Sequence, residues 1–93
     1  MEARIEFDWD HENRKHLASH KVSPNEFEEL LNNDPLELNY ELIDDEERYR
    51  SVGLTNGGRL LSAVWTIREG RVRAITAFSS GIADRTAFLE RPK

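Results

Sequence analysis

The chain has 93 residues, a mean hydropathy of −0.71 and a net charge of −5, which suit one domain over residues 1–93 with a modest hydrophobic core. It contains no cysteine, which excludes disulfides, thiol catalysis and cysteine–zinc sites and is typical of a reducing compartment. No apolar run approaches the roughly 20 residues of a membrane span, and the first residues lack the pattern of a secretory signal, so we expect a cytoplasmic protein that does not enter a membrane.

The first third of the chain predicts one strand and two helices. Apolar and acidic residues alternate over 5–9, which indicates a half-buried strand. Asp10 predicts the N-cap of a polar helix over 11–19. Ser23-Pro24-Asn25-Glu26 has the composition of a capping box with proline at the first helical position, and the second helix ends at 32–35.

The rest of the chain predicts four strands and a closing helix. An acidic turn is expected at 44–46, and the last helix at 81–91. The element order β-α-α-β-β-β-β-α describes an α+β fold, a small antiparallel meander sheet with two N-terminal helices and a C-terminal helix. The four strands are predicted at 36–42, 47–55, 59–68 and 71–78.

Charge is divided unevenly between the two halves. Residues 1–47 carry fifteen acidic and four basic side chains, whereas residues 48–93 carry three acidic and nine basic ones, eight of them arginine. Six arginines fall within residues 48–73. Because guanidinium groups form a rigid fork of donors that suits phosphate, the second half predicts a phosphate or nucleic-acid site. The alternative is that these arginines pair with the acidic half or keep strand ends soluble.

The last predicted hairpin gathers arginines on one face. Glu69-Gly70 has the composition of a two-residue turn, so residues equidistant from it should pair. Arg68 is then opposite Arg71 and Thr66 opposite Arg73, an arrangement that destabilises a sheet unless an anion or a carboxylate lies nearby. The same register continues this face with Val64 opposite Ile75 and Ser62 opposite Ala77. The other face of the hairpin is predicted to belong to the core. Its pairs are Ile67 with Val72, Trp65 with Ala74, Ala63 with Thr76 and Leu61 with Phe78.

Glu47-Arg48 precedes these arginines at the start of a neighbouring predicted strand. A carboxylate can take the proton from a ribose 2′-hydroxyl, and arginines can stabilise the charge that builds on the phosphorus. Such chemistry needs no metal. Glu47 is therefore predicted as a general base, and the alternative is that it only neutralises Arg68 or Arg73.

Three histidines lie on or near the first predicted helix. His11 lies about 140° around the helix from His16, so the spacing does not favour a metal site, and we expect no metal and no cofactor. His20 falls at the helix end, where it is expected to cap carbonyl groups or to serve as a substrate contact and proton donor.

Ordered motifs over residues 5–78 resemble the BrnT family of toxins. The motifs that carry the resemblance are Phe7-Asp8-Trp9-Asp10, Asn13, His20-Lys21-Val22-Ser23, Phe27-Glu28-Glu29, Asp34-Pro35, Glu47-Arg48, Gly58-Arg59-Leu60-Leu61, Thr66-Ile67-Arg68 and Val72-Arg73-Ala74-Ile75. Each motif is short, and their order and spacing together make the resemblance specific.

The resemblance implies a bacterial toxin of a type II toxin–antitoxin system with a RelE-like fold and metal-independent endoribonuclease activity. The partners that it implies are an RNA substrate and a cognate antitoxin, with DNA reached only through the antitoxin. It implicates Trp9 in the site together with the glutamate and arginines above. The complete prediction is a catalytic set of Glu47, Arg48, Arg68 and Arg73, and a substrate-binding set of Trp9, Thr66, Arg71 and His20.

The chain departs from the family pattern at several positions. The family usually carries arginine at the position of Phe78 and glycine at that of Lys21, and its closing helix is richer in arginine. A missing arginine would remove a transition-state contact worth about 2–4 kcal/mol, the scale of one oxyanion donor. Two alternatives to a ribonuclease therefore stay open. One is a catalytically degenerate BrnT-like module that binds a protein partner in an antitoxin or corepressor role, and the other is a sensor of a phosphate ligand.

Overall fold

The structure of the chain is a computed structural model that describes residues 4–92; residues 1–3 and 93 of the predicted domain lie outside the described part. Its elements follow the predicted order β-α-α-β-β-β-β-α, which confirms the α+β class. The strands are β1 (Phe7–Asp8), β2 (Leu36–Ile43), β3 (Glu46–Leu54), β4 (Leu60–Arg68) and β5 (Arg71–Ser79), and the helices are α1 (His11–Ser19), α2 (Pro24–Asn32) and α3 (Ile82–Leu89).

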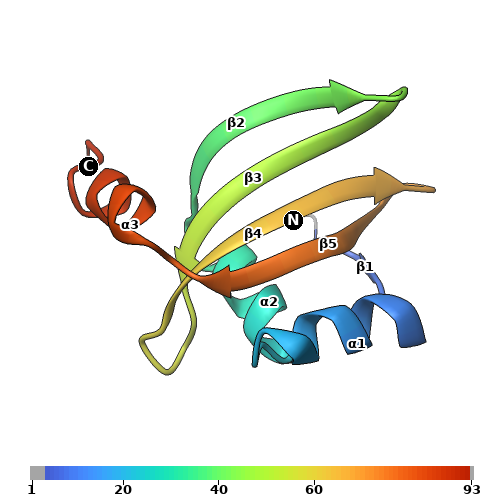
Figure 1. The fold of residues 1–93 in the computed structure, drawn as a ribbon, viewed down its shortest axis with the longest axis horizontal. Coiled ribbons are helices and arrows are strands. Elements are labelled where there is room, and N and C mark those ends of the chain that lie inside the picture. Colours follow the sequence, from blue (N-terminus) through green and yellow to red (C-terminus); the bar gives the residue numbers. More distant parts are fainter. Residues whose placement is uncertain (1–3, 93) are drawn as a thin grey trace.

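The five strands form one mixed sheet in the order β1-β5-β4-β3-β2 (Figure 1). Strands β2 to β5 are an antiparallel meander, and β1 pairs parallel with β5 through Phe7 and Val72. The strand predicted at 5–9 is shorter than expected. It ends at Asp8, because the carbonyl oxygen of Asp8 accepts a hydrogen bond from the side chain of Asn13 in α1.

Both N-terminal helices begin at the predicted caps. The amide of Asn13 donates to the Asp10 carboxylate at 2.9 Å, and the Asp10 amide donates to the Asn13 side chain at the same distance. Ser23 and Glu26 form the equivalent reciprocal pair at 3.1 Å in both directions. Each cap satisfies helix amides that have no partner within the helix, which is why α1 and α2 start where they do.

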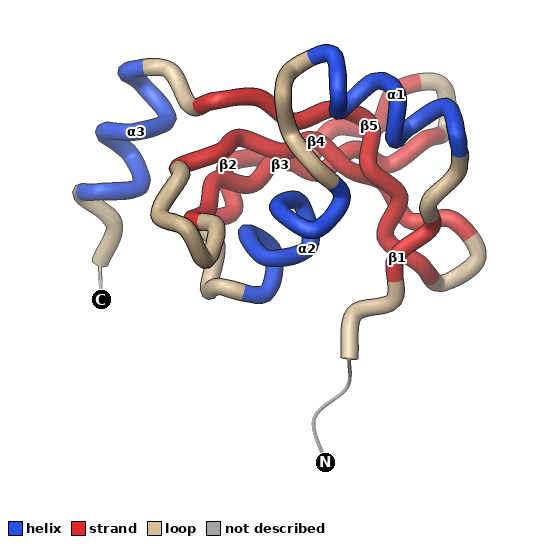
Figure 2. The backbone as a smooth tube through the Cα atoms, turned by 90° about the horizontal axis from the view of Figure 1, so that it is seen from below, coloured by secondary structure: helices blue, strands red, loops and turns tan. Residues whose placement is uncertain are grey.

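The main hydrophobic core lies between the sheet and α2. Figure 2 shows α2 against one face of the sheet, which we call the helix face, and α1 beside β5. At Gly53 an added Cβ would lie only 2.6 Å from the carbonyl oxygen of Leu30, so α2 can approach β3 this closely only over glycine. The buried core consists of Leu17, Val22, Phe27, Leu30, Leu31, Leu61, Ala63, Ala74 and Ala77.

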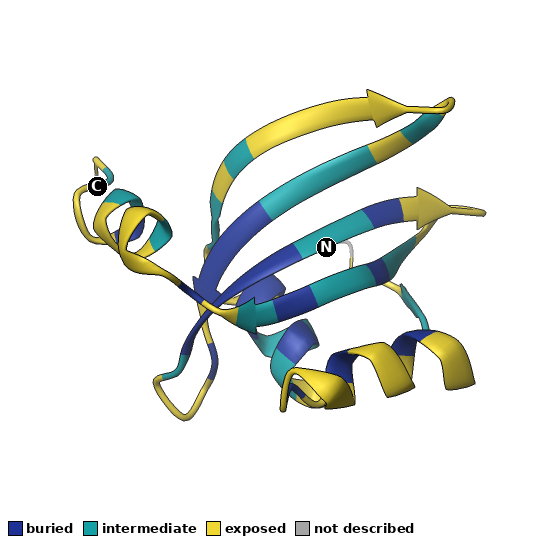
Figure 3. Cartoon of the chain, viewed as in Figure 1, coloured by how far each residue is buried: buried dark blue, intermediate teal, exposed yellow. Residues whose placement is uncertain are grey.

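A smaller cluster packs on the opposite face. Phe88 of α3 is buried there against Val52 and Leu60. The Asp84 carboxylate of α3 accepts hydrogen bonds from Arg50 and Ser62, which fixes the helix to β3 and β4. Helix α3 covers only one end of this face. Toward the two hairpin turns the strands become intermediate or exposed (Figure 3).

Two-residue turns close the β2–β3 and β4–β5 hairpins. Asp44 and Asp45 have φ angles of 49° and 65°, and Glu69 and Gly70 have φ angles of 52° and 77°. Positive φ at both central residues defines type I′, the turn whose twist matches paired strands. The predicted Glu69-Gly70 turn is confirmed. The turn predicted at 44–46 was one residue too long, because Glu46 already belongs to β3, where it pairs with Ile43.

The β4–β5 register agrees with the prediction only near the turn. The four pairs closest to Glu69-Gly70 are confirmed, including Arg68 with Arg71 and Thr66 with Arg73. Beyond Trp65 a bulge adds one residue to β5, so the four remaining predicted pairs were wrong by one position. The bulge brings buried Ala77 onto the helix face. The observed pairs there are Val64 with Thr76, Ala63 with Ala77, Ser62 with Phe78 and Leu61 with Ser79. Ile67, predicted on the core face, is half exposed.

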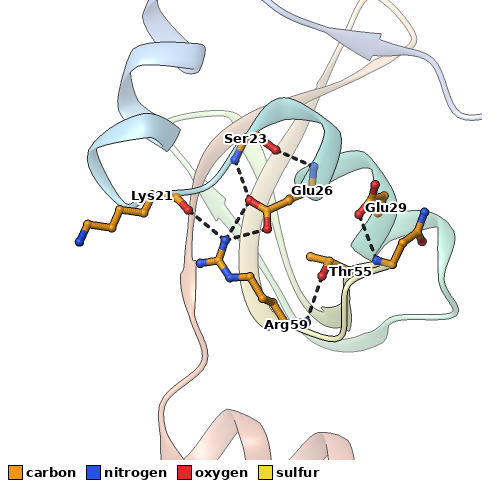
Figure 4. Close-up of polar contacts among 7 residues, drawn as sticks. Lys21, Ser23, Glu26, Glu29, Thr55 and Arg59 are labelled. Carbon is orange, nitrogen blue, oxygen red and sulfur yellow. Dashed lines mark hydrogen bonds and ion pairs between the residues drawn. The ribbon is translucent and has the colours of Figure 1, made fainter.

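Two of the six clustered arginines have structural ion pairs, Arg50 with Asp84 and Arg59 with Glu26. The guanidinium of Arg59 donates to both carboxylate oxygens of Glu26, at 2.9 and 2.7 Å, and to the carbonyl of Lys21 at 3.0 Å (Figure 4). Burial works to raise the pKa of Glu26, but hydrogen bonds from Ser23 and the charge of Arg59 outweigh it and hold that pKa below its ordinary value. This arginine pairs with the acidic half, as the alternative reading of the charge pattern proposed.

Candidate active site

Five arginines of β3, β4 and β5 lie on the face of the sheet that α2 leaves uncovered, and one of them, Arg50, is paired there with Asp84 of α3. The ladder places Arg68 with Arg71 and Thr66 with Arg73, and side-chain alternation places Arg48 of β3 on the same side. We call this side, opposite the helix face, the arginine face. It is the face that carries α3 at one end, and it lies open beside α1 (Figure 1).

A hollow of about 850 Å³ opens on the arginine face between α1 and the sheet. We call it the arginine hollow. Arg73 contributes from β5, Arg68 from the end of β4 and Glu46 from the start of β3, while Asp10 and His16 line it from the side of α1. Residues distant in the sequence, and of both charge signs, therefore meet at one solvent-accessible site.

Arg73 is the most buried guanidinium of the hollow, with a side chain 11% exposed. It forms ion pairs with Asp8 at 3.4 Å and with Asp10 at 2.8 Å. The amide of Asn13, and after it Arg73, lower the pKa of Asp10 below its ordinary value. The two aspartates thus hold Arg73 in one position and fully offset its charge.

Arg68 differs from its neighbours in lacking such a partner. Within residues 4–92, no carboxylate lies within ion-pair distance of Arg68. Arg71 does have a carboxylate nearby, since its Nε lies 3.6 Å from Glu6. Both side chains are more than half exposed, so this ion pair contributes little to stability. The five donors of Arg68 are consequently available to an anion that enters the hollow.

Glu46 and Glu47 lie on opposite sides of β3. Glu46 lines the arginine hollow, and its carboxylate accepts a hydrogen bond from Nε of Arg48 at 3.0 Å. The Glu47 carboxylate instead accepts a hydrogen bond from the hydroxyl of Tyr49 at 2.7 Å, which raises the pKa of Tyr49. The structure does not bring Glu47 into the arginine hollow, because the short turn sets the alternation so that Glu46 faces the arginines.

A second, smaller hollow of about 490 Å³ lies between the diverging ends of β3 and β4. The β3–β4 ladder ends at Tyr49 and Trp65, so the strands separate before Glu46. Glu47 borders this second hollow, as do Thr66 and Arg68. Thr66, a predicted substrate contact, is almost fully buried on the arginine face.

The remaining predicted site residues are distributed differently. Arg48 borders a separate hollow beside β2 and reaches the arginine hollow only through Glu46. Trp9 lies in the core on the helix face, where its ring packs edge-on to Phe27 and its Nε1 donates to Glu28. The structure therefore does not group Trp9 with the arginines.

His20 is the C-cap residue of α1, the position predicted from the sequence. Its ring lies 5.4 Å from that of His16 and 6.4 Å from that of Phe78. Within residues 4–92, no group of three or more His, Cys, Asp or Glu side chains is placed to hold a metal ion. In the same part of the chain, no helix is long and apolar enough to cross a membrane.

Sequence reasoning missed three acidic residues and one histidine of this site: Asp8, Asp10, Glu46 and His16. The position of Glu46 could have been found by counting from a two-residue Asp44-Asp45 turn, which puts Glu46 in phase with Arg48. The aspartates had no comparable signal, because only the parallel pairing of β1 with β5 brings Asp8 next to Arg73.

Fold and site together define a small α+β protein with an arginine-lined hollow beside its first helix. The family model of the ribonuclease toxin BrnT of type II toxin–antitoxin systems matches residues 9–80, most of the chain. The protein belongs to this family, as its ordered motifs predicted. Comparison with curated proteins finds no match.

Proposed function

We propose that the protein is a metal-independent endoribonuclease that acts in the cytoplasm and is neutralised by a cognate antitoxin. Membership of a family of ribonuclease toxins supports the reaction class. The observation that carries the proposal is Arg68, a guanidinium without an ion-pair partner among residues 4–92, in the same hollow as Arg73 and Glu46. Such a set suits a bound phosphodiester flanked by a carboxylate.

The carboxylate of Glu46 serves as the general base in this proposal. It takes the proton from a ribose 2′-hydroxyl, and the 2′-oxygen then attacks the adjacent phosphorus. Negative charge accumulates on the non-bridging oxygens, where Arg68 and Arg73 donate hydrogen bonds. Arg48 holds the Glu46 carboxylate through the 3.0 Å contact and acts on the substrate only through it.

Arg73 enters this reaction already positioned. Because Asp8 and Asp10 fix its guanidinium, little side-chain entropy is lost when a phosphate binds. Arg68 supplies the charge that no neighbouring carboxylate offsets. The two arginines therefore have different roles, one as a fixed donor and one as the main electrostatic attraction.

The test is cleavage of a structured RNA by the purified toxin in excess EDTA. Arg68→Ala should lower the cleavage rate about 10²- to 10³-fold, the loss expected for one donor to the transition state. Arg85→Ala is the matched control, since Arg85 is exposed on α3, away from the hollow. Equal rates for Arg68→Ala and wild type would refute the site, and wild-type cleavage only after Mg²⁺ is added would refute metal independence.

A second candidate function rests on Phe78. The family usually has arginine at this position, and here the aromatic ring packs near His20 at the margin of the arginine face. A toxin that has lost a phosphate contact could persist as a binding module for its antitoxin, with DNA reached through that partner. A folded wild-type protein that binds its antitoxin but cleaves no RNA would favour this function.

A further inference from the structure

The bulge in β5 changes which side chains reach the arginine face. The additional residue is Ile75, after which Thr76 pairs with Val64 and Phe78 with Ser62. Without the bulge, Thr76 and Phe78 would point to the helix face, because side chains alternate along a strand. Bulges frequently re-aim a side chain beside an active site, and this one re-aims two.

Both redirected side chains support a pair of histidines from α1. Nε2 of His16 lies 3.1 Å from Oγ1 of Thr76. The ring of His20 lies 5.4 Å from that of His16 and 6.4 Å from that of Phe78. His16 is thus held from two directions, and it still lines the arginine hollow with an exposed side chain.

One nitrogen of His16 stays available to a ligand. The contact to Thr76 uses Nε2, and among residues 4–92 no hydrogen bond joins Nδ1 to another residue. In its imidazolium form His16 would donate from Nε2 to the threonine and keep a second proton on Nδ1. Leu17, the next residue, is fully buried and anchors this turn of α1 to the core.

The order of elements puts His16 and Glu46 on opposite walls of the hollow. The sheet order β5-β4-β3 carries Arg73, Arg68 and Glu46 in succession, and α1 runs beside β5. Neighbouring strands lie about 4.8 Å apart where they pair, and β3 and β4 separate before Glu46, so at this end β3 lies more than about 10 Å from β5, which leaves room for a bound phosphodiester between the two walls. A base and an acid on either side of bound phosphate suit a displacement in which the entering and leaving oxygens are in line.

We infer that His16 is the general acid of the cleavage reaction and that Thr76 positions it, an inference that rests on the proposed ribonuclease function. The 2′-oxygen gives its proton to Glu46 and forms a bond to phosphorus. The bond between phosphorus and the 5′-oxygen breaks, and that oxygen takes a proton from the imidazolium of His16. The products are a 2′,3′-cyclic phosphate and a 5′-hydroxyl, and proton exchange with water restores both side chains.

A substrate with sulfur in place of the leaving 5′-oxygen separates this role from others. A thiolate leaves without being protonated, so a general acid is not needed for that substrate. The wild-type protein and the variants His16→Ala and Glu46→Gln are compared on all-oxygen RNA and on the 5′-thio analogue, in EDTA. We expect His16→Ala to lose about 10²- to 10⁴-fold on all-oxygen RNA and to approach the wild-type rate on the analogue. Glu46→Gln should be slow on both substrates.

Thr76→Val tests the positioning role. Valine has nearly the same shape as threonine but cannot form a hydrogen bond with Nε2 of His16. Thr76→Val should therefore lose less cleavage rate on all-oxygen RNA than His16→Ala does, and none on the analogue. Thr86→Val, on the exposed side of α3, is the matched control.

Two different failures can be distinguished. If His16→Ala is equally slow on both substrates, or as fast as wild type on both, the inference is wrong while the ribonuclease proposal stands. If the wild-type toxin cleaves neither substrate, the proposed function fails and the inference fails with it.

Discussion

The neighbouring glutamates at the start of β3 provide the sharpest test of the site. Glu46→Gln and Glu47→Gln remove the same charge one residue apart, on opposite sides of the strand. Only Glu46 lines the arginine hollow, whereas the Glu47 carboxylate is engaged by the Tyr49 hydroxyl. We therefore expect Glu46→Gln to abolish most RNA cleavage and Glu47→Gln to retain it.

The expected magnitude follows from the chemistry and from the exposure of the pair. Loss of a general base costs about 10²- to 10⁴-fold in rate, equivalent to about 3–5 kcal/mol in the activation barrier. The side chains of Glu46 and Arg48 are 42% and 38% exposed, so their ion pair contributes at most about 1 kcal/mol to folding. Glu46→Gln should therefore lower the cleavage rate strongly and change the free energy of unfolding by at most about 1 kcal/mol.

The assay is single-turnover cleavage of a defined RNA in EDTA, with thermal unfolding of each variant as the folding control. A second measurement checks that Glu47→Gln weakens the hydrogen bond from the Tyr49 hydroxyl. Since the hydrogen bond to the Glu47 carboxylate is the main cause of the raised pKa of Tyr49, that pKa should fall in ultraviolet titration. Loss of activity in Glu47→Gln with an active Glu46→Gln would refute the reasoning and restore the base predicted from the sequence.

Three further predictions concern stability. Gly53→Ala should lower the free energy of unfolding by about 1–3 kcal/mol, because its Cβ would collide with the Leu30 carbonyl oxygen, and an unchanged denaturation midpoint would contradict this. Lys21 has a φ of 59°, a left-handed conformation that is strained for any residue with a Cβ, so Lys21→Gly should raise the free energy of unfolding by about 1 kcal/mol. A lower denaturation midpoint would show that Lys21 is not strained. Glu26 has a lowered pKa in the folded protein, so its stabilisation is fully present above its ordinary pKa of 4.5 and is lost as pH falls through the folded value. Glu26→Gln should therefore flatten the acid end of the stability–pH curve, and an identical curve would disprove the linkage.

The sequence by itself determined the elements and their order. The capping boxes at Asp10 and Ser23 and the turn at Glu69-Gly70 depend on residues within about four positions of one another, so their signals are local. Ordered motifs likewise identified the family. The clustered arginines and the hairpin pairs nearest the turn were predictable for the same reason, since register is set from the turn outward.

Only the tertiary structure decided which acid meets which arginine. The parallel pairing of β1 with β5 brings Asp8 to Arg73. The bulge in β5 buries Ala77 in the core and turns Thr76 toward His16. The two-residue turn before β3 places Glu46, and not Glu47, in the arginine hollow. The physical reason is the two-residue period of a strand. A shift of one residue exchanges its two faces, and contacts between distant elements, rather than local preference, determine that shift.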